Sequence, residues 1–271
     1  MNKKNSPYTA AITGGGFLFE ETNILLPLLR ATNSEELLHD EKVNNRLLHI
    51  NAESSRKKAI LEIKRRYESM PSSFWDDFLE MSDTDKIVAI FYVILRTYKI
   101  CFDFHVNVAI KKWNSISKSI DKNDIMMEFN EIASKDEFVD SWSDNTKDKV
   151  ASAYLTILRK VGMLDNSNHL NAISCSNFSY YLGKGQPWFL EACLLQPYEI
   201  ENNDMTIKEL DDKLNSPGFQ DTENGDLFYN FFIYQYPAEK EYDIRKQIQE
   251  FKANLIRPTN YVDVLTLNLF D

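Results

Sequence analysis

Six of the fifteen residues in the segment SSRKKAILEIKRRYE, positions 54 to 68, are Lys or Arg, although the 271-residue chain has a formal net charge of −10. Ammonium and guanidinium groups gathered in this way can bind phosphate. The hydroxyls of Ser54 and Ser55 precede them at the start of a predicted helix, where free backbone N–H groups also favour phosphate. The segment therefore predicts contact with an anionic polymer such as nucleic acid. The alternative interpretation is that these side chains solvate the exposed face of an ordinary helix.

A helical wheel separates the side chains of this segment into two faces. With Arg56 placed at zero, the side chains of Ala59, Ile60, Ile63 and Tyr67 lie within about 60° of it and should face a core. Lys57 and Lys64 lie at about 90°, and Lys58 and Arg65 at about 190°. These four side chains form a basic stripe opposite the core, and Arg56 is the weakest of the proposed ligands. The predicted DNA-binding residues of the segment are Ser54, Ser55, Arg56, Lys57, Lys58, Lys64 and Arg65.

The neighbouring helices give this segment the outline of a helix-turn-helix. Residues 33–48 predict a helix that begins at an Asn33-Ser34 cap, with acidic residues in its first turn. After a break near Asn51, a second helix continues to about Ser69 and is stopped by Pro71. A helix pair whose second member is basic is typical of a helix-turn-helix that contacts DNA.

A second group of three helices is predicted between residues 124 and 162. The last of them begins at a Ser143 cap and ends at Gly162, which can adopt the left-handed conformation of a helix end. Two short apolar stretches then flank a turn at residues 165–168 and predict a small β-hairpin. Three helices followed by a hairpin are the outline of a winged helix-turn-helix.

The third helix of this group has a core face and a polar face. The side chains predicted to face the core are Val150, Tyr154, Leu158 and Val161. Those predicted to face outward are Lys149, Ser152, Thr156 and Lys160. Acidic residues dilute the charge at its amino-terminal end, so the alternative is a core helix with an ordinary surface. Lys149 and Lys160 complete the set of predicted DNA-binding residues.

The predicted fold class is mainly α, with helical bundle modules of helix-turn-helix or winged-helix character and a minor β-hairpin. Residues 1–120 form an amino-terminal helical domain, and a polar stretch near 114–123 marks its end. Residues 121–182 form the winged-helix-like module, and residues 183–271 form an acidic, aromatic-rich carboxy-terminal region.

Charge is unevenly distributed between these regions. Residues 54–66 carry a balance of +5, whereas residues 199–226 carry −7. The carboxy-terminal region predicts helices at 186–197, 205–218 and 239–257. Its aromatic stretch 226–236 fits a buried strand or a helix. Because the acidic part would repel DNA, we expect it to face away from DNA, toward a partner protein.

The sequence predicts no catalytic, metal or cofactor site. The histidines lack metal-ligand spacing, and Asp103 and His105 lie two residues apart on a predicted helix, so they do not face each other. The TGGG stretch at 13–16 lacks the Lys-Ser or Lys-Thr of a phosphate loop and predicts a turn with close backbone packing. We therefore expect a protein that is not an enzyme.

Three features predict a cytoplasmic protein that does not enter a membrane. The cysteines Cys101, Cys175 and Cys193 are odd in number and widely spaced, which favours reduced thiols. The first residues lack the apolar core of a signal peptide. The longest apolar run, IVAIFYVIL, is about half of the roughly 20 residues that a membrane-spanning helix needs.

Several blocks of the sequence follow one another in an ordered series, namely YTAAITGGGFLFEET, NRLLHINAESSRKKAILEIKRRY, FWDDF, AIKKW and FVDSWSDNTKDKVASAYLTILRKVGMLD. In this order the chain resembles the BrxA family, components of bacteriophage exclusion (BREX) defence systems. The resemblance covers about residues 8–165. It implies a mainly α-helical, non-enzymatic protein that acts beside a BREX methyltransferase, ATPase and other factors, with a NusB-like or DNA-binding character.

The leading hypothesis is a DNA-binding accessory protein of a BREX system, with double-stranded DNA and other BREX proteins as partners. Binding should depend mainly on phosphates and be weakly sequence-specific, because Lys offers few bidentate base contacts. One alternative is a protein-interaction scaffold of the BREX complex, whose basic stripe meets an acidic partner. The other is a NusB-like RNA-binding protein, which the lack of an obvious aromatic set beside the stripe disfavours.

Overall fold

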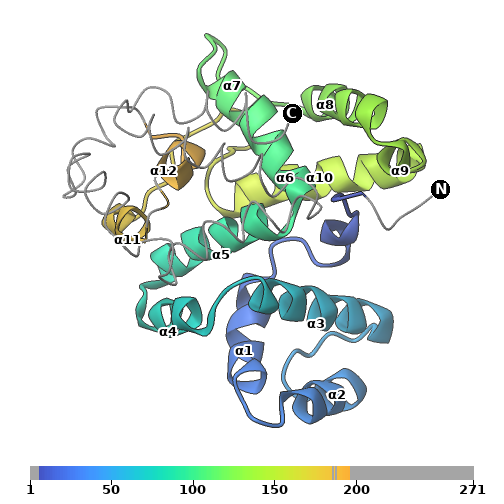
Figure 1. The fold of residues 1–271 in the computed structure, drawn as a ribbon, viewed down its shortest axis with the longest axis vertical. Helices are drawn as coiled ribbons and strands as arrows, with labels where there is room; N and C mark the ends of the chain where they lie inside the picture. The colour runs from blue at the N-terminus through green and yellow to red at the C-terminus, as the bar shows by residue number, and fades with distance from the viewer. Residues whose placement is uncertain (1–5, 185, 187, 196–271) are drawn as a thin grey trace, which may run out of the picture.

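The computed structural model describes residues 6–184, 186 and 188–195, and within them the chain is mainly helical (Figure 1), as predicted. The predicted helices 205–218 and 239–257, the aromatic stretch 226–236 and the acidic part of the carboxy-terminal region lie outside the described residues. The elements are a 3-10 helix η1 (Ala11–Gly14), α1 (Phe19–Leu29), α2 (Ser34–Asn44), α3 (Glu53–Glu68), α4 (Ser72–Glu80), α5 (Asp83–Thr97), α6 (Lys99–Phe104), a π-helix η2 (His105–Ile110), α7 (Lys111–Trp113), α8 (Lys122–Lys135), α9 (Glu137–Asp140), α10 (Asp144–Lys160), α11 (Phe178–Gly183) and α12 (Trp188–Ala192).

Helices α1, α2 and α3 form a small lobe with its own core at one end of the molecule (Figure 1). The buried side chains of this core are Leu25, Leu29, Leu38, Leu48, Ile60 and Ile63. The sequence predicts that Pro27 kinks or ends the first part of α1, but the helix continues through it to Leu29. The link between α2 and α3 spans residues 45–52, and it begins with Asn45 in the left-handed conformation (φ 50°).

A larger core surrounds α5, which lies in the middle of the molecule (Figure 1). Every residue of α5 from Val88 to Thr97 is buried, as expected for a helix with neighbours on all sides. The large cluster extends from Ile12 to Leu194 and crosses the predicted boundary near residue 120, since Phe104 packs edge-on against Phe129 with ring centroids 4.8 Å apart.

The apolar segment 82–113 is helical on both sides of one break, at Tyr98. Ser82 caps α5 by accepting from the Asp85 backbone N–H, and α5 ends at Thr97 because Tyr98 is extended (φ −121°, ψ 101°). From Lys99 the chain runs through α6, η2 and α7 to Trp113.

Helices α8, α9 and α10 are placed largely as the sequence predicts. Asp121 forms a capping box with Asp124 at the start of α8. Ser143 caps α10 by accepting from the Thr146 N–H, and Gly162 adopts the left-handed conformation (φ 83°) beyond its end, which confirms both predicted signals.

The β-hairpin predicted after α10 is wrong in extent. The turn at 165–168 forms, since the Asp165 N–H donates to the His169 carbonyl. Only two isolated antiparallel bridges accompany it within the described residues, Leu164 with Leu170 and Ser119 with His169. The flanking segments are too short for a ladder because α10 ends at Lys160 and the side chains of Met163 and Leu164 turn into the helical core.

Candidate nucleic-acid interface

The inner side of α3 is held by buried charged residues as well as by apolar ones. Arg66 is 1% exposed and donates to the Phe17 and Gly16 carbonyls and to the Tyr98 hydroxyl. The Tyr98 hydroxyl in turn donates to Glu62, with an O···O distance of 2.8 Å. Burial raises the pKa of Tyr98, so this hydroxyl stays protonated and available as a donor. The network fixes α3 against the segment that follows η1 and against the α5–α6 junction.

Arg56 also belongs to the interior, so its predicted role in DNA binding is wrong. Its side chain is 5% exposed, and its guanidinium donates to the carbonyls of Lys42, Val43 and Ile50. Carbonyls at the end of a helix lack partners within the helix, and the guanidinium supplies them for α2. Arg56 therefore fixes the α2–α3 link, as its position on the apolar side of the wheel allows.

Glu41 completes this link from the other side. Its buried carboxylate accepts from the backbone N–H groups of residues 46, 47 and 48. A buried carboxylate is stable only when its oxygens are hydrogen-bonded, and here the loop supplies every donor. The turn that sets the position of α3 thus depends on a carboxylate and a guanidinium that contact backbone.

The outer side of α3 carries the predicted basic stripe, defined as Lys57, Lys58, Lys64 and Arg65. Lys57 and Lys58 are exposed, and Lys64 and Arg65 are partly exposed. Ser54 and Ser55 are exposed at the amino-terminal end of α3, where Ala52 provides no side-chain cap. Leu61 lies between the basic residues and is 55% exposed, a feature that the helical wheel did not single out.

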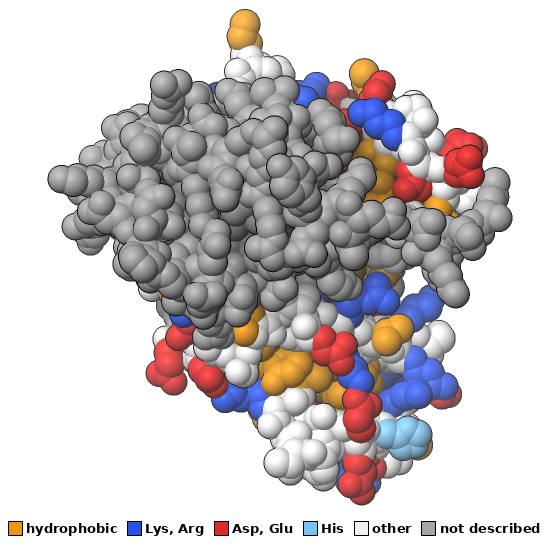
Figure 2. Space-filling model, viewed as in Figure 1, with side chains coloured by type: hydrophobic (Ala, Val, Ile, Leu, Met, Phe, Trp, Pro, Cys, Tyr) orange, Lys and Arg blue, Asp and Glu red, His pale blue; other side chains and the backbone are white. Residues whose placement is uncertain are grey.

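Three of the four cations in the stripe contact carboxylates of the same protein. Lys57 pairs with Glu53, Lys64 with Glu35 of α2, and Arg65 lies 3.7 Å from Glu62. The hydrogen bond with Glu35 raises the pKa of Lys64, and the hydrogen bond with Lys57 lowers the pKa of Glu53. Figure 2 shows the result on the surface of the α1–α3 lobe, where blue basic and red acidic side chains are interspersed.

Lys58 differs from its neighbours because it has no ion pair with any residue in the described part of the chain. Its aliphatic stem lies close to Gly14 of η1, where a Cβ on that glycine would be 3.5 Å from the Lys58 Cβ. A Cβ on the adjacent Gly15 would lie 2.3 Å from the Leu18 Cδ1, so the Leu18 side chain would have to move. Gly16 adopts the left-handed conformation (φ 61°), so the TGGG stretch forms a turn, as the sequence predicts, with close packing at Gly15.

Helix α10 places both of its predicted DNA-binding residues on the surface. Lys149 and Lys160 are exposed, and neither has an ion-pair partner among residues 6–184, 186 and 188–195. The predicted inward residues Val150, Tyr154, Leu158 and Val161 are all buried. The acidic dilution expected at the amino-terminal end is reduced, because Asp148 pairs with Lys122 of α8.

Helices α3 and α10 both pack against the 3-10 helix η1. Both helices contact η1, which lies between them (Figure 1). The sequence places Ser54, Ser55, Lys57, Lys58, Lys64 and Arg65 on one helix and Lys149 and Lys160 on another, and the structure keeps these as two surfaces on either side of η1.

Polar groups in the interior are used for packing. His105 is fully buried, lies 2.9 Å from the Tyr154 hydroxyl and 2.7 Å from the Ala192 carbonyl oxygen, and burial lowers its pKa to about 4. Asp103 instead contacts Lys99 and Tyr8. Within the described residues no group of three His, Cys, Asp or Glu side chains could hold a metal ion.

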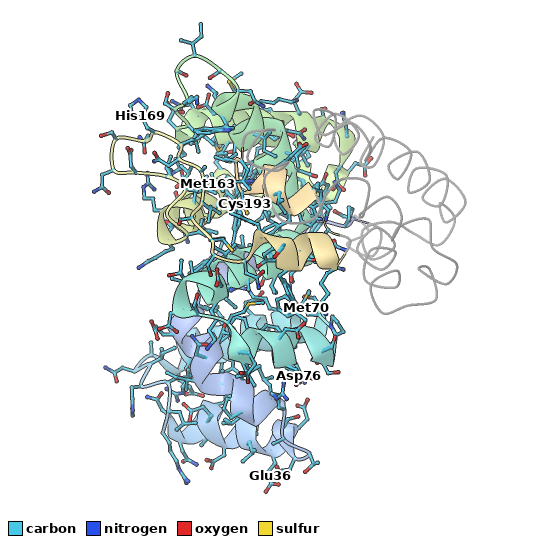
Figure 3. All side chains as sticks on the ribbon, turned by 90° about the vertical axis from the view of Figure 1, so that its left-hand side faces the viewer. Glu36, Met70, Asp76, Met163, His169 and Cys193 are labelled. Carbon is cyan, nitrogen blue, oxygen red and sulfur yellow. The ribbon has the colours of Figure 1, made fainter. Side chains whose placement is uncertain are left out.

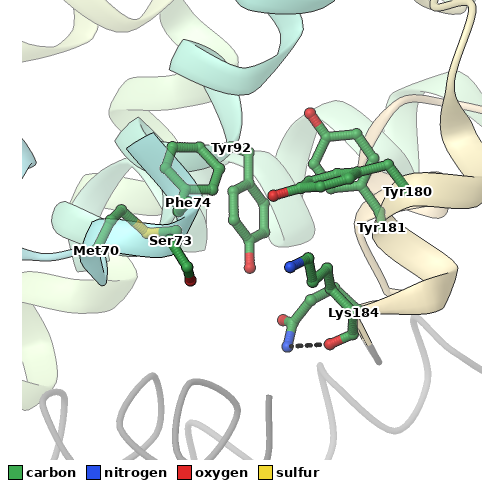
Figure 4. Close-up of a pocket in the computed structure, with 8 residues that line it drawn as sticks. Met70, Ser73, Phe74, Tyr92, Tyr180, Tyr181 and Lys184 are labelled. Carbon is green, nitrogen blue, oxygen red and sulfur yellow. Dashed lines mark hydrogen bonds between the residues drawn. The ribbon is translucent and has the colours of Figure 1, made fainter. Parts of the chain in front are cut away.

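A small pocket lies away from both surfaces, between α4, α5 and α11 (Figure 4). Its aromatic walls include Phe74, Tyr92, Tyr180 and Tyr181. The space is about 10 Å³, which accommodates about one water molecule. Lys184 at its edge is paired with Asp77, 3.0 Å away.

None of the helices in the described residues combines the length and apolar character needed to cross a membrane.

Comparisons with known proteins agree with this architecture. The BrxA family model matches residues 6–176 of the chain. An uncharacterized protein from Magnetospirillum magneticum, known from a crystal structure, is 22% identical; the match covers 69% of this chain and 97% of that one, with a TM-score of 0.59. At this identity the likeness concerns the fold alone. No curated protein matches the chain.

Proposed function

We propose that this chain is a non-enzymatic DNA-binding accessory protein of a BREX phage-defence system. The chain belongs to the BrxA family, whose members are components of such systems. It contacts the phosphate backbone of duplex DNA through the outer face of α3. The observation that carries the proposal is the shared outward direction of Lys57, Lys58, Lys64 and Arg65 on a helix whose inner side is fixed by hydrogen bonds.

The ion pairs on this face are compatible with phosphate binding. Exposed ion pairs contribute only about 0–1 kcal/mol each, so a phosphate can replace a carboxylate partner at little cost. Lys58 requires no such exchange, because it is unpaired among the described residues, and Ser54 and Ser55 add hydroxyls at the amino-terminal end. Lysine-rich contacts of this kind position a protein on DNA and carry little sequence information.

The ion pairs also favour a second candidate, a scaffold that binds another BREX protein. An outer face with alternating charges, such as Glu53–Lys57 and Lys64–Glu68, suits a protein partner with its own mixed charges. In that case the cations contribute to a protein interface and duplex DNA has no specific place on α3.

A mobility-shift titration of the full chain with duplex DNA at two salt concentrations tests the proposal. The variant Lys57→Ala/Lys58→Ala/Lys64→Ala/Arg65→Ala should bind more weakly, and its salt slope should fall by about one unit for each phosphate that it no longer neutralises. A matched variant, Arg30→Ala/Lys86→Ala/Lys111→Ala/Lys135→Ala, removes four cations outside α3 and should keep most of the slope.

The outcomes separate the two candidates. If the wild-type chain shows no salt-sensitive binding, or if the folded α3 variant binds like the wild type, the DNA proposal is wrong. If that variant instead fails to co-purify with BREX proteins, the scaffold is favoured. A single-stranded RNA competitor that displaces duplex DNA with higher affinity would point to RNA as the ligand.

A further inference from the structure

The region 119–170 has a helix-turn-helix connection that the α1–α3 lobe lacks. Residues 141–143 alone join α9 to α10, within the three or four residues typical of such a turn, whereas α2 and α3 are joined by 45–52. Asp136 caps α9 and Ser143 caps α10 through their side chains, so both helix starts are fixed. By this short connection to α9, which spans four residues, α10 has the place in the chain of the second helix of a helix-turn-helix.

Two loops are fastened together beside the carboxy-terminal end of α10. Arg159 donates to the Asn168 side chain at 2.7 Å, and the Asn168 carbonyl accepts from the Ile120 N–H at 3.0 Å. The bridges of His169 with Ser119 and of Leu170 with Leu164 complete the arrangement. The segment before α8 thus pairs with the segment after α10, and the turn 165–168 is fixed at the surface. Figure 3 shows His169 on the outer side of this turn, well away from the buried Cys193.

The outer face of α10 combines unpaired cations with small hydroxyl side chains. Lys149, Ser152, Thr156 and Lys160 recur at helical spacing, and the two lysines have no ion pair within the described residues. The Thr156 hydroxyl donates to the Ser152 carbonyl at 2.8 Å, so its oxygen keeps lone pairs that can accept a further hydrogen bond. This face therefore offers charge at its ends and short polar groups at its centre.

We propose that α10 enters the major groove of duplex DNA, with Ser152 and Thr156 at base edges and Lys149 and Lys160 on flanking phosphates. The inference rests on the proposed DNA-binding function and deepens it, because it assigns sequence readout to α10 and backbone contact to α3. Short hydroxyl side chains let a helix approach base edges closely, and the Thr methyl can contact a thymine methyl. The fixed turn 165–168 lies beside the end of α10, where it contacts the adjacent backbone.

The test compares two α10 variants in a selection from a library of random duplexes with the full chain. Ser152→Ala/Thr156→Ala removes no charge, so its salt slope should equal that of the wild type. Its enriched sequences should change, and its affinity for the wild-type sequence should fall about tenfold. Lys149→Ala/Lys160→Ala should instead weaken binding to every sequence and lower the salt slope by about two units.

The control variant Thr32→Ala/Ser134→Ala also replaces one Thr and one Ser by Ala, but outside α10. It should enrich the same duplex sequences as the wild-type protein. Thermal unfolding verifies that each variant is folded. The assignment of α10 is overturned if the wild type enriches no sequence, or if Ser152→Ala/Thr156→Ala enriches the same sequences with the same affinity. If the wild type binds duplex DNA with a salt slope but the α10 variants bind as the wild type does, the proposed binding to the DNA backbone stands and the sequence readout by α10 is wrong. Absence of any salt-sensitive binding rejects both.

Discussion

Helices α3 and α10 present lysines outward in similar ways but are anchored by different chemistry. The inner side of α3 contains Arg56, Glu62 and Arg66, each at most 5% exposed and each bonded to a neighbouring segment. The inner side of α10 is largely apolar, with the Tyr154 hydroxyl directed at His105. One helix is therefore fixed by buried charges, and the other by hydrophobic packing around a buried imidazole.

The outer sides differ in the opposite sense. Most cations of the α3 stripe contact carboxylates, whereas Lys149 and Lys160 of α10 are unpaired among the described residues. The number of basic residues in a helix thus overstates the charge that its surface offers to a ligand. In α3, the side chains of Arg56 and Arg66 serve the fold, and only Lys58 is free of an internal competitor within the described region.

The largest expected effect separates two adjacent arginines of α3. Arg66→Ala should lower the free energy of unfolding by about 3–5 kcal/mol, because it leaves the Gly16 and Phe17 carbonyls and the Tyr98 hydroxyl without their buried partner. Arg65→Ala, at a partly exposed site, should cost less than about 1 kcal/mol. Unfolding in denaturant, followed by circular dichroism, measures both.

Arg66→Lys serves as a milder substitution if Arg66→Ala does not fold. A lysine keeps the charge but cannot reach three acceptors in the fixed geometry of a guanidinium, so it should remain clearly less stable than the wild type. Equal stabilities of the Arg65 and Arg66 variants would contradict the division of α3 into a structural and an exposed side.

The anchor of α10 should make stability depend on pH. Burial lowers the pKa of His105 to about 4, whereas in the unfolded chain this group should titrate near the ordinary histidine pKa of 6.5. Between these two pKa values the unfolded state binds more protons than the folded state. The contribution of His105 to the free energy of unfolding is therefore fully present above the unfolded-state pKa and is lost as the pH falls toward the folded-state pKa. The expected loss from this group is about 3 kcal/mol.

Unfolding of the wild type and of His105→Gln at about pH 7 and about pH 4.5 isolates this contribution, since carboxylates affect both proteins equally. The variant should be less stable at the higher pH but should lose less stability on acidification. Parallel pH profiles for the two proteins would show that His105 is not the titrating group.

Local sequence signals predicted much of this arrangement. The Ser143 cap, the Gly162 helix end, the extent of α3 and the burial of one face of α10 follow from spacing and residue type. The wheel also placed Arg56 on the apolar side, although its polar partners could not be inferred. Those partners are backbone carbonyls of residues 42, 43 and 50, brought near by tertiary packing.

The ion pairs of the basic stripe could be predicted only in part. The pairs Glu53–Lys57 and Lys64–Glu68 follow from i,i+4 spacing along one helix. The pair between Glu35 and Lys64 joins α2 to α3 and depends on how the two helices pack, which no local window contains. The exposed position of Leu61, by contrast, agrees with the helical wheel, on which Leu61 lies at about 140° from Arg56, between the basic side chains.

The smallest expected effect tests whether the carboxylates reduce the affinity of α3 for DNA. Glu35→Gln removes the carboxylate charge that pairs with Lys64 and leaves this cation only the longer contact with Glu68, so phosphate competes more easily, while a surface pair of this kind adds little to stability. Duplex affinity should rise about two- to threefold at low salt, and the salt slope should steepen by less than about one unit.

The neighbouring Glu36 is exposed on the same helix and has no ion pair with a described residue, so Glu36→Gln controls for the general loss of a negative charge. Tighter binding by Glu35→Gln alone would show that the pairing with Lys64 sets the difference between α3 and α10. Equal affinities for both variants would assign that difference to overall charge.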